Sequence, residues 1–287
     1  MKHCFSYYNT CALITGASSG LGAEFARQLA PHARDLILVA RRGERLKILS
    51  QELIKLNPAL RVHVKVIDVG NSAEREKLAV WTIEQKLQLN LLINNAGLGD
   101  LSEFGDASWN RLEAILNVNI TALTHLTHLL LPLLRQHRPS AILNVGSIAG
   151  YLPLTGYLVY AASKAYVRSF SEALRIEEAC HNVTVSLLSP GPVPTEFFDV
   201  ASRQGEKISV TERAAAPLIT SKEKVVKTAL QGVLSHQPEI IPNFLLRVVF
   251  TISLKLPFFL QRKILFKKRK NEIATRKAGN FTISSFF

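Results

Sequence analysis

The stretch Cys11-Ala12-Leu13-Ile14-Thr15-Gly16-Ala17-Ser18-Ser19-Gly20-Leu21-Gly22 joins a short apolar run directly to a glycine-rich turn. The apolar run predicts a buried strand, and the helical spacing of residues 21–30 predicts a helix after the turn. Glycines let a backbone turn tightly and approach a pyrophosphate, and the unpaired N–H groups at a helix N-terminus attract the same anion. The stretch therefore predicts a strand, a phosphate-binding loop and a helix in succession.

The rest of the chain repeats this alternation of short apolar runs and longer segments with helical spacing. Such an order predicts an α/β fold with a parallel sheet and helices on both faces. The runs are apolar on both sides, as expected of strands buried in a doubly wound (Rossmann) sheet. Seven strands are expected at residues 11–15, 36–40, 62–67, 91–94, 141–145, 183–188 and 239–241, and six helices at 21–30, 44–56, 73–89, 109–135, 157–180 and 222–235.

Length and composition fit a single folded domain with an added C-terminal segment. The chain has 287 residues, of which 47% are hydrophobic and 20% charged, and this balance excludes a wholly disordered protein. We expect residues 1–242 to form the Rossmann domain. Residues 243–287 form an extension that is apolar first and basic afterwards.

The positive charge is concentrated near the C-terminus. The chain carries 35 Lys and Arg against 22 Asp and Glu, a net charge of +13, and residues 240–287 contribute ten of the cations and one acid. The preceding residues are therefore close to neutral and contain no recognised nucleic-acid-binding motif. No nucleic acid is expected as a partner.

The cysteines and the first residues indicate the compartment. Cys4, Cys11 and Cys180 are odd in number and scattered, so neither a disulfide framework nor a metal site is expected. Reduced thiols are typical of the cytoplasm. Residues 1–10 lack the apolar run of a signal peptide, which agrees with a cytoplasmic protein.

Residues 16–20 also match G-x-S-x-G, the nucleophile elbow of α/β-hydrolases, and a strand–turn–helix context suits that motif as well. An elbow serine needs an oxyanion hole that the loop of an earlier strand helps to build, but this motif follows the first strand. His181 and His236 show no sign of being its catalytic partner. We therefore reject the hydrolase interpretation.

The end of the second expected strand indicates which dinucleotide the loop would hold. A carboxylate about 20 residues after the glycine-rich loop would accept the 2′-hydroxyl of NAD and repel a 2′-phosphate. Here the strand ends in Ala40, followed by Arg41 and Arg42. Because a guanidinium binds phosphate through paired hydrogen bonds, the two arginines predict NADP(H), with Arg41 favoured as the ligand.

A second group of polar residues follows later in the chain. Tyr160 and Lys164 are four residues apart in an expected helix and therefore share one of its faces. A lysine ammonium beside a phenol is expected to lower the pKa of the tyrosine, which would then exchange a proton with a carbonyl or alcohol oxygen. Ser147, just after the fifth expected strand, could hydrogen-bond the same oxygen. Together the three residues predict a proton-transfer site.

These motifs, in this order, make residues 11–195 resemble the short-chain dehydrogenase/reductase family. The resemblance implies hydride transfer with a nicotinamide coenzyme, with Ser147, Tyr160 and Lys164 catalytic and Asn119 holding a water in a proton relay. Ala122 and Gly146 depart from the family pattern, but both are small and neither removes a catalytic group. Cofactor contacts are expected at Gly16, Ser18, Ser19, Gly20, Leu21, Gly22, Arg41, Arg42, Asp68, Val69, Asn95, Ala96, Gly97, Tyr160, Lys164, Pro190, Gly191, Val193 and Thr195.

The residues near the expected carbonyl indicate the substrate class. Apolar or aromatic side chains dominate there, and no Arg or Lys is placed to bind a carboxylate, so a small hydrophobic ketone, aldehyde or secondary alcohol is expected. The alternative is that these side chains only pack a substrate lid, which the resemblance places at about residues 192–221. The residues concerned are Tyr151, Leu152, Pro153, Leu154, Tyr157, Phe197 and Phe198.

Two other functions remain open for the chain. One is an NADPH sensor without turnover, and the other is a protein that binds a membrane surface. Charges and prolines interrupt residues 240–260, so a membrane span is not expected. We expect this segment to pack over the pocket or a subunit interface. The basic residues that follow it are expected to be solvated. By the same resemblance, the helices at 109–135 and 157–180 would form the interface of a dimer or tetramer.

Overall fold

Seven strands form one sheet, in a computed structural model that describes residues 5–201 and 216–277. All neighbouring strands are parallel, and each expected strand is present within three residues of its expected ends, which confirms the doubly wound α/β fold. The order across the sheet is β3 (Arg61–Val66), β2 (Ala33–Ala40), β1 (Thr10–Thr15), β4 (Leu91–Asn94), β5 (Ser140–Val145), β6 (Val183–Leu188) and β7 (Glu239–Ile240).

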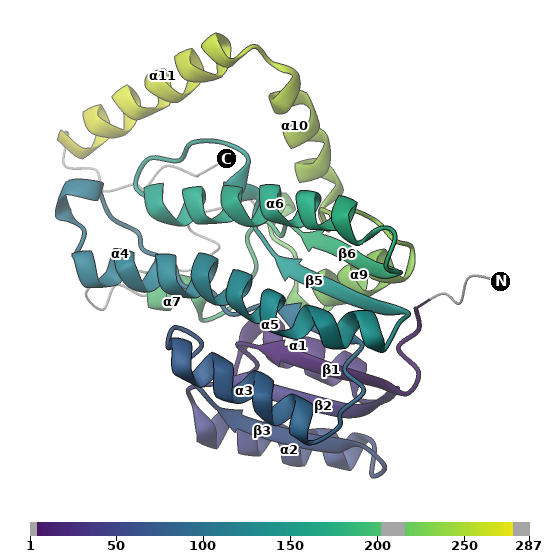
Figure 1. Ribbon diagram of the computed structural model, residues 1–287. Helices are drawn as coiled ribbons and strands as arrows, with labels where there is room; N and C mark the ends of the chain where they lie inside the picture. The colour runs from purple at the N-terminus through teal and green to yellow at the C-terminus, as the bar shows by residue number, and fades with distance from the viewer. Residues whose placement is uncertain (1–4, 202–215, 278–287) are drawn as a thin grey trace.

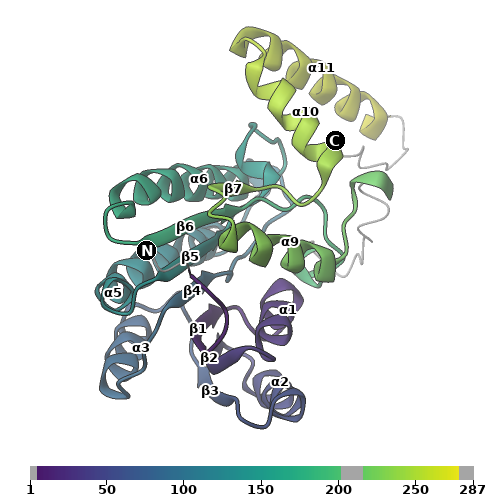
Figure 2. The same cartoon turned by 90° about the vertical axis from the view of Figure 1, so that its right-hand side faces the viewer.

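Helices cover both faces of the sheet (Figures 1 and 2). One face carries α1 (Gly20–Leu29), α2 (Gly43–Leu56) and α9 (Lys222–Leu234), and the other carries α3 (Ser72–Glu84), α5 (Leu123–Gln136) and α6 (Leu158–Glu178). The central strands are fully buried between these layers, which explains why their sequences are apolar on both sides.

Two helices differ from their predicted extents. The helix expected at 73–89 ends at Glu84, because Lys86 adopts a left-handed conformation with φ of +51° that an α-helix cannot continue. The helix expected at 109–135 consists of α4 (Trp109–Leu116), the π-helical turn η2 (Asn117–Ala122) and α5. Such π-helical turns often mark functional sites, and this one contains Asn119.

The run Trp109–Gln136 is, within the described part of the chain, long and apolar enough to cross a membrane by length and composition. Its buried leucines pack against the sheet, with Leu126, Leu130 and Leu134 almost fully enclosed. The apolar composition of this run is therefore that of a core helix.

The two central strands, β1 and β4, position the site. After β1 the chain turns into α1 on one face, whereas after β4 it continues to α4 on the other face (Figures 1 and 2). Neighbouring strands whose connections leave in opposite directions open a crevice beyond their carboxyl ends. The glycine-rich loop, residues 16–22, borders this crevice on one side, and Asn95 borders it on the other.

The chain continues past β7 with two further helices, α10 (Phe244–Lys255) and α11 (Phe258–Lys277), which lie beyond the β7 edge of the sheet (Figure 2). The expected division at residue 242 falls between β7 and α10. Of the expected lid, residues 202–215 lie outside the described residues. Its described parts include α7 (Phe197–Ala201) and the 3-10 turn η4 (Ala216–Leu218).

Candidate active site

A cavity of about 380 Å³ lies at the carboxyl ends of the central strands. The glycine-rich loop, the ends of β2 to β6, helix α6 and the segment after β6 all contribute to its lining. Among the residues predicted for catalysis and coenzyme binding, all except Gly22 and Asn119 line this cavity. Of the residues expected near the substrate, Tyr151, Leu152 and Pro153 do not line it. The fold thus gathers residues that are up to 184 positions apart in the chain, from Gly16 to Val200, around one space.

The glycine-rich loop fits closely against the segment after β4. Gly16 has φ of +68°, and a Cβ there would lie 2.9 Å from Nδ2 of Asn95. A Cβ on Gly22 would lie 2.3 Å from the carbonyl oxygen of Gly16. Gly22 therefore lies behind the loop, where it allows α1 to approach, and it does not line the cavity.

Hydrogen bonds fix the loop in this shape. Nδ2 of Asn95 donates to the carbonyl oxygen of Thr15 at 2.9 Å, and Thr15 Oγ1 accepts from the backbone N–H groups of Asn95 and Ala96 at 2.9 and 3.0 Å. The side chain of Asn95 is thus engaged with the loop itself. Thr15 was not predicted as a functional residue, and only its position at a strand end could have indicated this role.

The start of α1 suits a bound anion. Ser19 is the N-cap residue, but its side chain makes no capping hydrogen bond, and the first turn contains no acidic residue. The first N–H groups of the helix therefore have no side-chain cap, and no carboxylate in this turn repels an anion. The loop and helix start fit the pyrophosphate of a dinucleotide such as NAD(P)(H).

One end of the cavity, which we name the arginine end, contains Arg41, Arg42, Asp68 and Glu196, with Arg45 beside them. Arg42 donates to Ser18 Oγ at 3.1 Å and to Ser19 Oγ at 2.5 Å. The guanidinium of Arg42 also lies 2.9 Å from Glu196, and Arg45 lies 2.7 Å from both oxygens of the same carboxylate. Arg41 instead lies 3.8 Å from Asp68.

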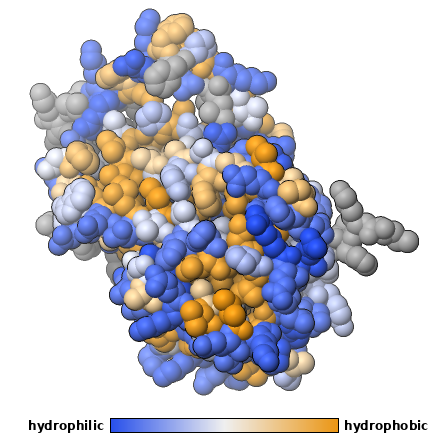
Figure 3. All heavy atoms as spheres, viewed as in Figure 1, coloured by the Kyte–Doolittle hydropathy of each residue, from blue (hydrophilic) through white to orange (hydrophobic). Residues whose placement is uncertain are grey.

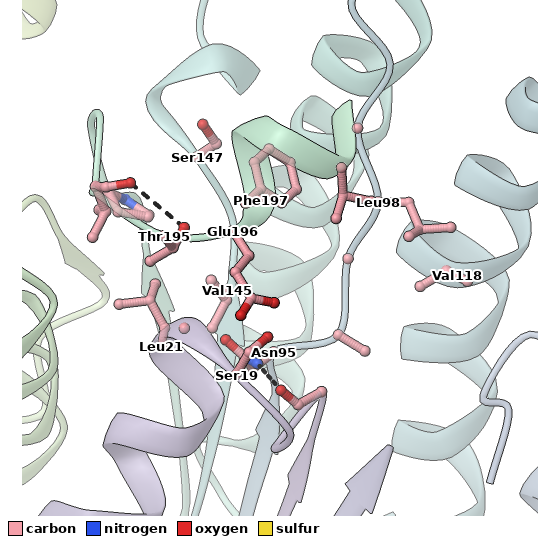
Figure 4. A pocket seen from close by; sticks show the side chains of 18 of the residues that line it. Ser19, Leu21, Asn95, Leu98, Val118, Val145, Ser147, Thr195, Glu196 and Phe197 are labelled. Atoms are coloured by element: carbon pink, nitrogen blue, oxygen red, sulfur yellow. Dashed lines mark hydrogen bonds between the residues drawn. The ribbon is translucent and has the colours of Figure 1, made fainter. Parts of the chain in front are cut away.

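Glu196 was missed by the sequence reasoning. The hydrogen bonds from Arg42 and Arg45 hold the pKa of its carboxyl below the usual range, so it is ionised at neutral pH. Figure 4 shows Glu196 extending toward Ser19, whereas its neighbour Phe197 lies on the opposite side, toward Leu98. No local pattern could have indicated the pairing with Arg45, because 151 residues separate the two.

The surroundings of Ser18 agree with rejecting a hydrolase. Its hydroxyl oxygen accepts a hydrogen bond from Arg42, whereas an elbow serine needs a basic partner that removes its proton. Among the described residues that line the cavity there is no histidine.

The opposite end, which we name the tyrosine end, contains Ser147, Tyr160 and Lys164. Tyr160 and Lys164 project from α6, and Ser147 directly follows β5, where its Oγ accepts the N–H of Ala149 at 3.1 Å. A hydrogen bond joins the side chains of Ser147 and Tyr160. Lys164 Nζ donates to the carbonyl oxygen of Val145 at 2.8 Å. The fold therefore places these three residues together, as the sequence predicted.

The expected effect of Lys164 on Tyr160 is corrected by the structure. Burial raises the pKa of Tyr160 to about 12, and the hydrogen bond with Ser147 lowers it only in part. Burial also lowers the pKa of Lys164 to about 8, and its Nζ lies 5.7 Å from the centre of the Tyr160 ring. The loss of phenolate hydration outweighs a distant, weakened cation, so Tyr160 is a neutral phenol at physiological pH.

Asn119 lies outside the cavity, behind its wall. Its Nδ2 donates to the carbonyl oxygen of Leu98 and to Ser163 Oγ, both at 2.9 Å, and its Oδ1 accepts the N–H of Leu98 at 2.8 Å. A Cβ on Gly97 would lie 3.5 Å from both Asn119 Oδ1 and Lys164 Nζ. Asn119 thus fixes the segment after β4 close to Lys164.

Apolar side chains surround Tyr160. The rings of Tyr157 and Phe197 have their centres 5.1 and 5.4 Å from that of Tyr160, and Leu98, Leu154 and Phe198 also line the cavity. Among the described lining residues, Lys164 is the one charged side chain outside the arginine end. Tyr151 and Leu152, expected near the substrate, pack against α10 instead.

Comparison with known proteins gives a consistent result. The family model "short chain dehydrogenase" matches residues 10–206, which contain every predicted site residue. Sulfoacetaldehyde reductase of Chromohalobacter salexigens is 38% identical over 192 residues, 65% of this chain and 74% of that protein. Very-long-chain 3-oxoacyl-CoA reductase of Podospora anserina is 32% identical over 236 residues, 82% of this chain and 66% of that protein.

The fold has a close counterpart among solved structures. A short-chain dehydrogenase from Sphingobium yanoikuyae in complex with NADPH superimposes with a TM-score of 0.73 and 28% identity, over 92% of this chain and 95% of that chain. The likeness therefore extends beyond the family match to most of the described chain.

Proposed function

The chain belongs to the short-chain dehydrogenase/reductase family, and from this premise we propose that it is an NADP(H)-dependent oxidoreductase that interconverts an apolar ketone or aldehyde with its alcohol. Members of this family act on alcohols and carbonyls with NAD(P)(H). The observation that carries the proposal is one cavity with Ser147, Tyr160 and Lys164 at one end and the glycine-rich loop with its arginines at the other.

The tyrosine end would supply the proton in reduction. The neutral phenol of Tyr160 donates its proton to the substrate oxygen, and the hydroxyl of Ser147 hydrogen-bonds the same oxygen. The bound coenzyme supplies the hydride. In oxidation Tyr160 must first lose its proton and then accepts that of the alcohol.

Lys164 would connect Tyr160 to solvent. One of its N–H groups is held by Val145, and the others are left for the coenzyme ribose and for a water molecule. Asn119, just behind Gly97, would hold that water through the second lone pair of its Oδ1. Proton flow would then run from solvent past Asn119 and Lys164 to Tyr160.

Arg42 supports a preference for NADP(H). Its contacts with Ser18 and Ser19 place a guanidinium beside the glycine-rich loop. The residues directly after β2 are Arg41 and Arg42, so no carboxylate stands there to accept a 2′-hydroxyl. A guanidinium and two serine hydroxyls match the donors that a 2′-phosphate requires. Arg41, which the sequence alone favoured, lies near Asp68 instead, so Arg42 is the better candidate for the phosphate ligand.

Glu196 would compete with that phosphate. Its carboxylate lies against Arg42 and Arg45. A 2′-phosphate bound to Arg42 would lie close to this carboxylate, and the two negative groups would repel each other. Binding of NADP(H) would therefore displace Glu196 from Arg42. Because Phe197 follows directly and contacts Tyr160, this movement would change the wall beside the substrate.

The lining of the tyrosine end supports an apolar substrate. Sulfoacetaldehyde, the substrate in the name of one relative, carries a sulfonate that would need a cation beside the reacting carbonyl. Only Lys164 is charged there among the described lining residues, and it is engaged with Val145. A carbonyl with an apolar chain, of the kind that the name of the 3-oxoacyl-CoA reductase indicates, suits Leu98, Leu154 and the surrounding rings better.

We also propose that the protein is a cytoplasmic homo-oligomer. Helices α5 and α6 lie side by side on one face of the sheet (Figure 1), joined by a 3.0 Å hydrogen bond between Thr124 and Tyr166. Trp109, at the start of α4, and Ile176, near the end of α6, are exposed apolar side chains. A second copy packed here would cover them.

The proposed activity is tested by absorbance at the reduced-nicotinamide band. The protein would be mixed with a panel of apolar ketones, aldehydes and acyl thioesters, with NADPH and NADH in parallel. Oxidation of NADPH well ahead of NADH supports the proposal. Faster use of NADH would overturn the role of Arg42. Tight NADPH binding without turnover on any substrate would favour the sensor function.

A further inference from the structure

Among the described residues, helix α10 is attached to the domain through the side that carries Leu246 and Phe250. Leu246 and Phe250 of α10 are buried beside Ile148, and a Cβ on Gly191 would lie 2.2 Å from Leu246 Cδ1. Ile148 and Gly191 both line the cavity. Helix α10 thus packs directly behind the wall of the active site.

Polar contacts also hold this pair of helices. Arg269 of α11 donates to Glu103 at 2.7 Å, and Gln261 donates to the carbonyl oxygen of Leu256 at 2.9 Å, which fixes the turn between the helices. The pair is therefore held in a defined orientation relative to the domain.

The remaining side of α10 is exposed and apolar. Its exposed apolar residues recur at helical spacing and form one stripe, with Phe244 78% and Ile252 59% exposed. A soluble monomer rarely leaves such a continuous stripe in water. The stripe consists of Phe244, Leu245, Val248, Val249 and Ile252.

The exposed side of α11 combines aromatic rings with cations. Phe259, Lys263, Phe266 and Lys270 are spaced by four, three and four residues, so they share one helix face, and all four are exposed. Figure 3 shows apolar and hydrophilic side chains side by side at this end of the molecule. From residue 244 to residue 271 the sequence has eight Lys and Arg and no acid.

The positive charge of α10 and α11 indicates which kind of partner this surface binds. A second copy packed symmetrically would bring cations against cations. A nucleic acid would bind the lysines but leave the apolar stripe of α10 in water. An anionic lipid surface suits both the apolar stripe of α10 and the lysines of α11. The apolar side chains enter the boundary of the acyl chains, while the lysines bind the lipid phosphates.

We propose that α10 and α11 dock the protein on the surface of an anionic lipid bilayer. Neither helix spans the bilayer, since α10 has 12 residues and α11 carries several charges. Docking would place the cavity wall formed by Ile148 and Gly191 near the lipid. On the basis of the proposed function, an apolar carbonyl dissolved in the same bilayer would then be the accessible substrate.

The test uses the full chain and sedimentation with vesicles at low salt. We expect binding to vesicles of phosphatidylglycerol and phosphatidylcholine, little binding to phosphatidylcholine alone, and release at high salt. The variant K263Q/K267Q/K270Q should lose roughly a hundredfold in affinity, because each lysine near an anionic surface contributes about 1 kcal/mol. F244S/I252S should lose at least tenfold.

Matched control variants show whether vesicle binding depends on α10 and α11 or on exposed lysines and apolar side chains in general. K77Q/K86Q/K227Q removes three exposed lysines from the main domain, and I48S/I83S removes two exposed apolar side chains from α2 and α3. Both variants should bind vesicles as the unaltered protein does. Circular dichroism and NADPH oxidation on a water-soluble substrate should be unchanged in all four variants.

Several results would overturn the proposal. These are no sedimentation with anionic vesicles, equal loss in the control variants, or a dimer that F244S/I252S abolishes while vesicle binding stays absent. Salt-sensitive binding of duplex DNA in place of vesicles would indicate a nucleic acid instead. If vesicle binding fails while NADPH oxidation persists, the docking surface is wrong and the proposed function stands.

Discussion

The tyrosine end and the arginine end of the cavity differ in how they are built. Tyr160 and Lys164 are 7% and 4% exposed. At the other end the side chains of Arg42, Arg45 and Glu196 are 43%, 47% and 46% exposed. Water screens the charges of the second group far more than those of the first. Changes at the tyrosine end should therefore alter the rate of reaction, and changes at the arginine end should alter coenzyme binding by smaller factors.

The same contrast decides which physical effect shifts each pKa. Burial is the main cause for Tyr160 and Lys164, and it disfavours the charged form of both. For Glu196 the main cause is its pairing with Arg42 and Arg45, which favours the charged form. A neutral proton donor and an ionised surface network thus share one cavity.

The largest effect is expected from Tyr160→Phe, which removes the proton donor but keeps the ring that packs against Tyr157 and Phe197. We expect kcat to fall on the order of 10³-fold, the usual contribution of a positioned acid, with NADPH affinity unchanged. Steady-state NADPH oxidation measures this. Tyr166→Phe, on the same helix, is the control, and it should keep full activity.

The next effect is expected from Arg42→Ala at the arginine end. Loss of a charged hydrogen-bond donor should weaken NADPH binding by roughly tenfold to thirtyfold and leave NADH binding nearly unchanged. Fluorescence titration of the reduced nicotinamide measures both. Arg175→Ala removes an equally exposed arginine from an ion pair on α6 and should change neither. Equal weakening of NADPH and NADH would contradict the role of Arg42.

The pH dependence of kcat/KM should report the buried groups of the free protein. Lys164 loses its proton as the pH rises through its pKa of about 8. If the ammonium form is required, reduction should fall about tenfold between pH 7 and 9.

Oxidation should behave differently, because it also requires the phenolate of Tyr160, whose pKa is about 12. The fraction of phenolate rises tenfold per pH unit while the fraction of ammonium falls above pH 8. We therefore expect oxidation to rise up to about pH 8 and to level off above it. A parallel fall of both directions would contradict the assignment.

The smallest effect is expected from Glu196→Gln. The variant removes the charge that competes with a 2′-phosphate, so NADPH should bind up to about fivefold more tightly, the scale of an exposed ion pair. NADH affinity should change less. Glu172→Gln breaks a comparable exposed pair with Arg175 and serves as the control. Weaker NADPH binding in Glu196→Gln would show that Glu196 supports the coenzyme instead of competing with it.

Much of the fold follows from local pattern. The strands were predictable because burial on both faces leaves continuous apolar runs, as in Leu91–Asn94. Tyr160 and Lys164 were predictable because a four-residue spacing places both on one face of a helix. The end of α3 at Glu84 was not, because a lysine gives no local signal for the left-handed conformation that Lys86 adopts.

Other properties depend on the folded environment. The pairing of Glu196 with Arg45 joins two distant segments, and no local signal carries it. The pKa of Tyr160 was predicted in the wrong direction because sequence spacing indicates its neighbours but not how completely water is excluded. The two sides of α10 likewise became distinguishable only when Leu246 and Phe250 were found against the domain.

The central claim is that the tyrosine end acts on the rate of reaction and the arginine end on coenzyme binding. The most direct test is the single-turnover rate at saturating NADPH, compared between Tyr160→Phe and Arg42→Ala. The account predicts a rate on the order of 10³-fold slower in Tyr160→Phe and a rate within about twofold of the unaltered protein in Arg42→Ala, once the coenzyme is bound. Comparable losses in the two variants would contradict it, because the arginine end would then take part in the reaction step itself.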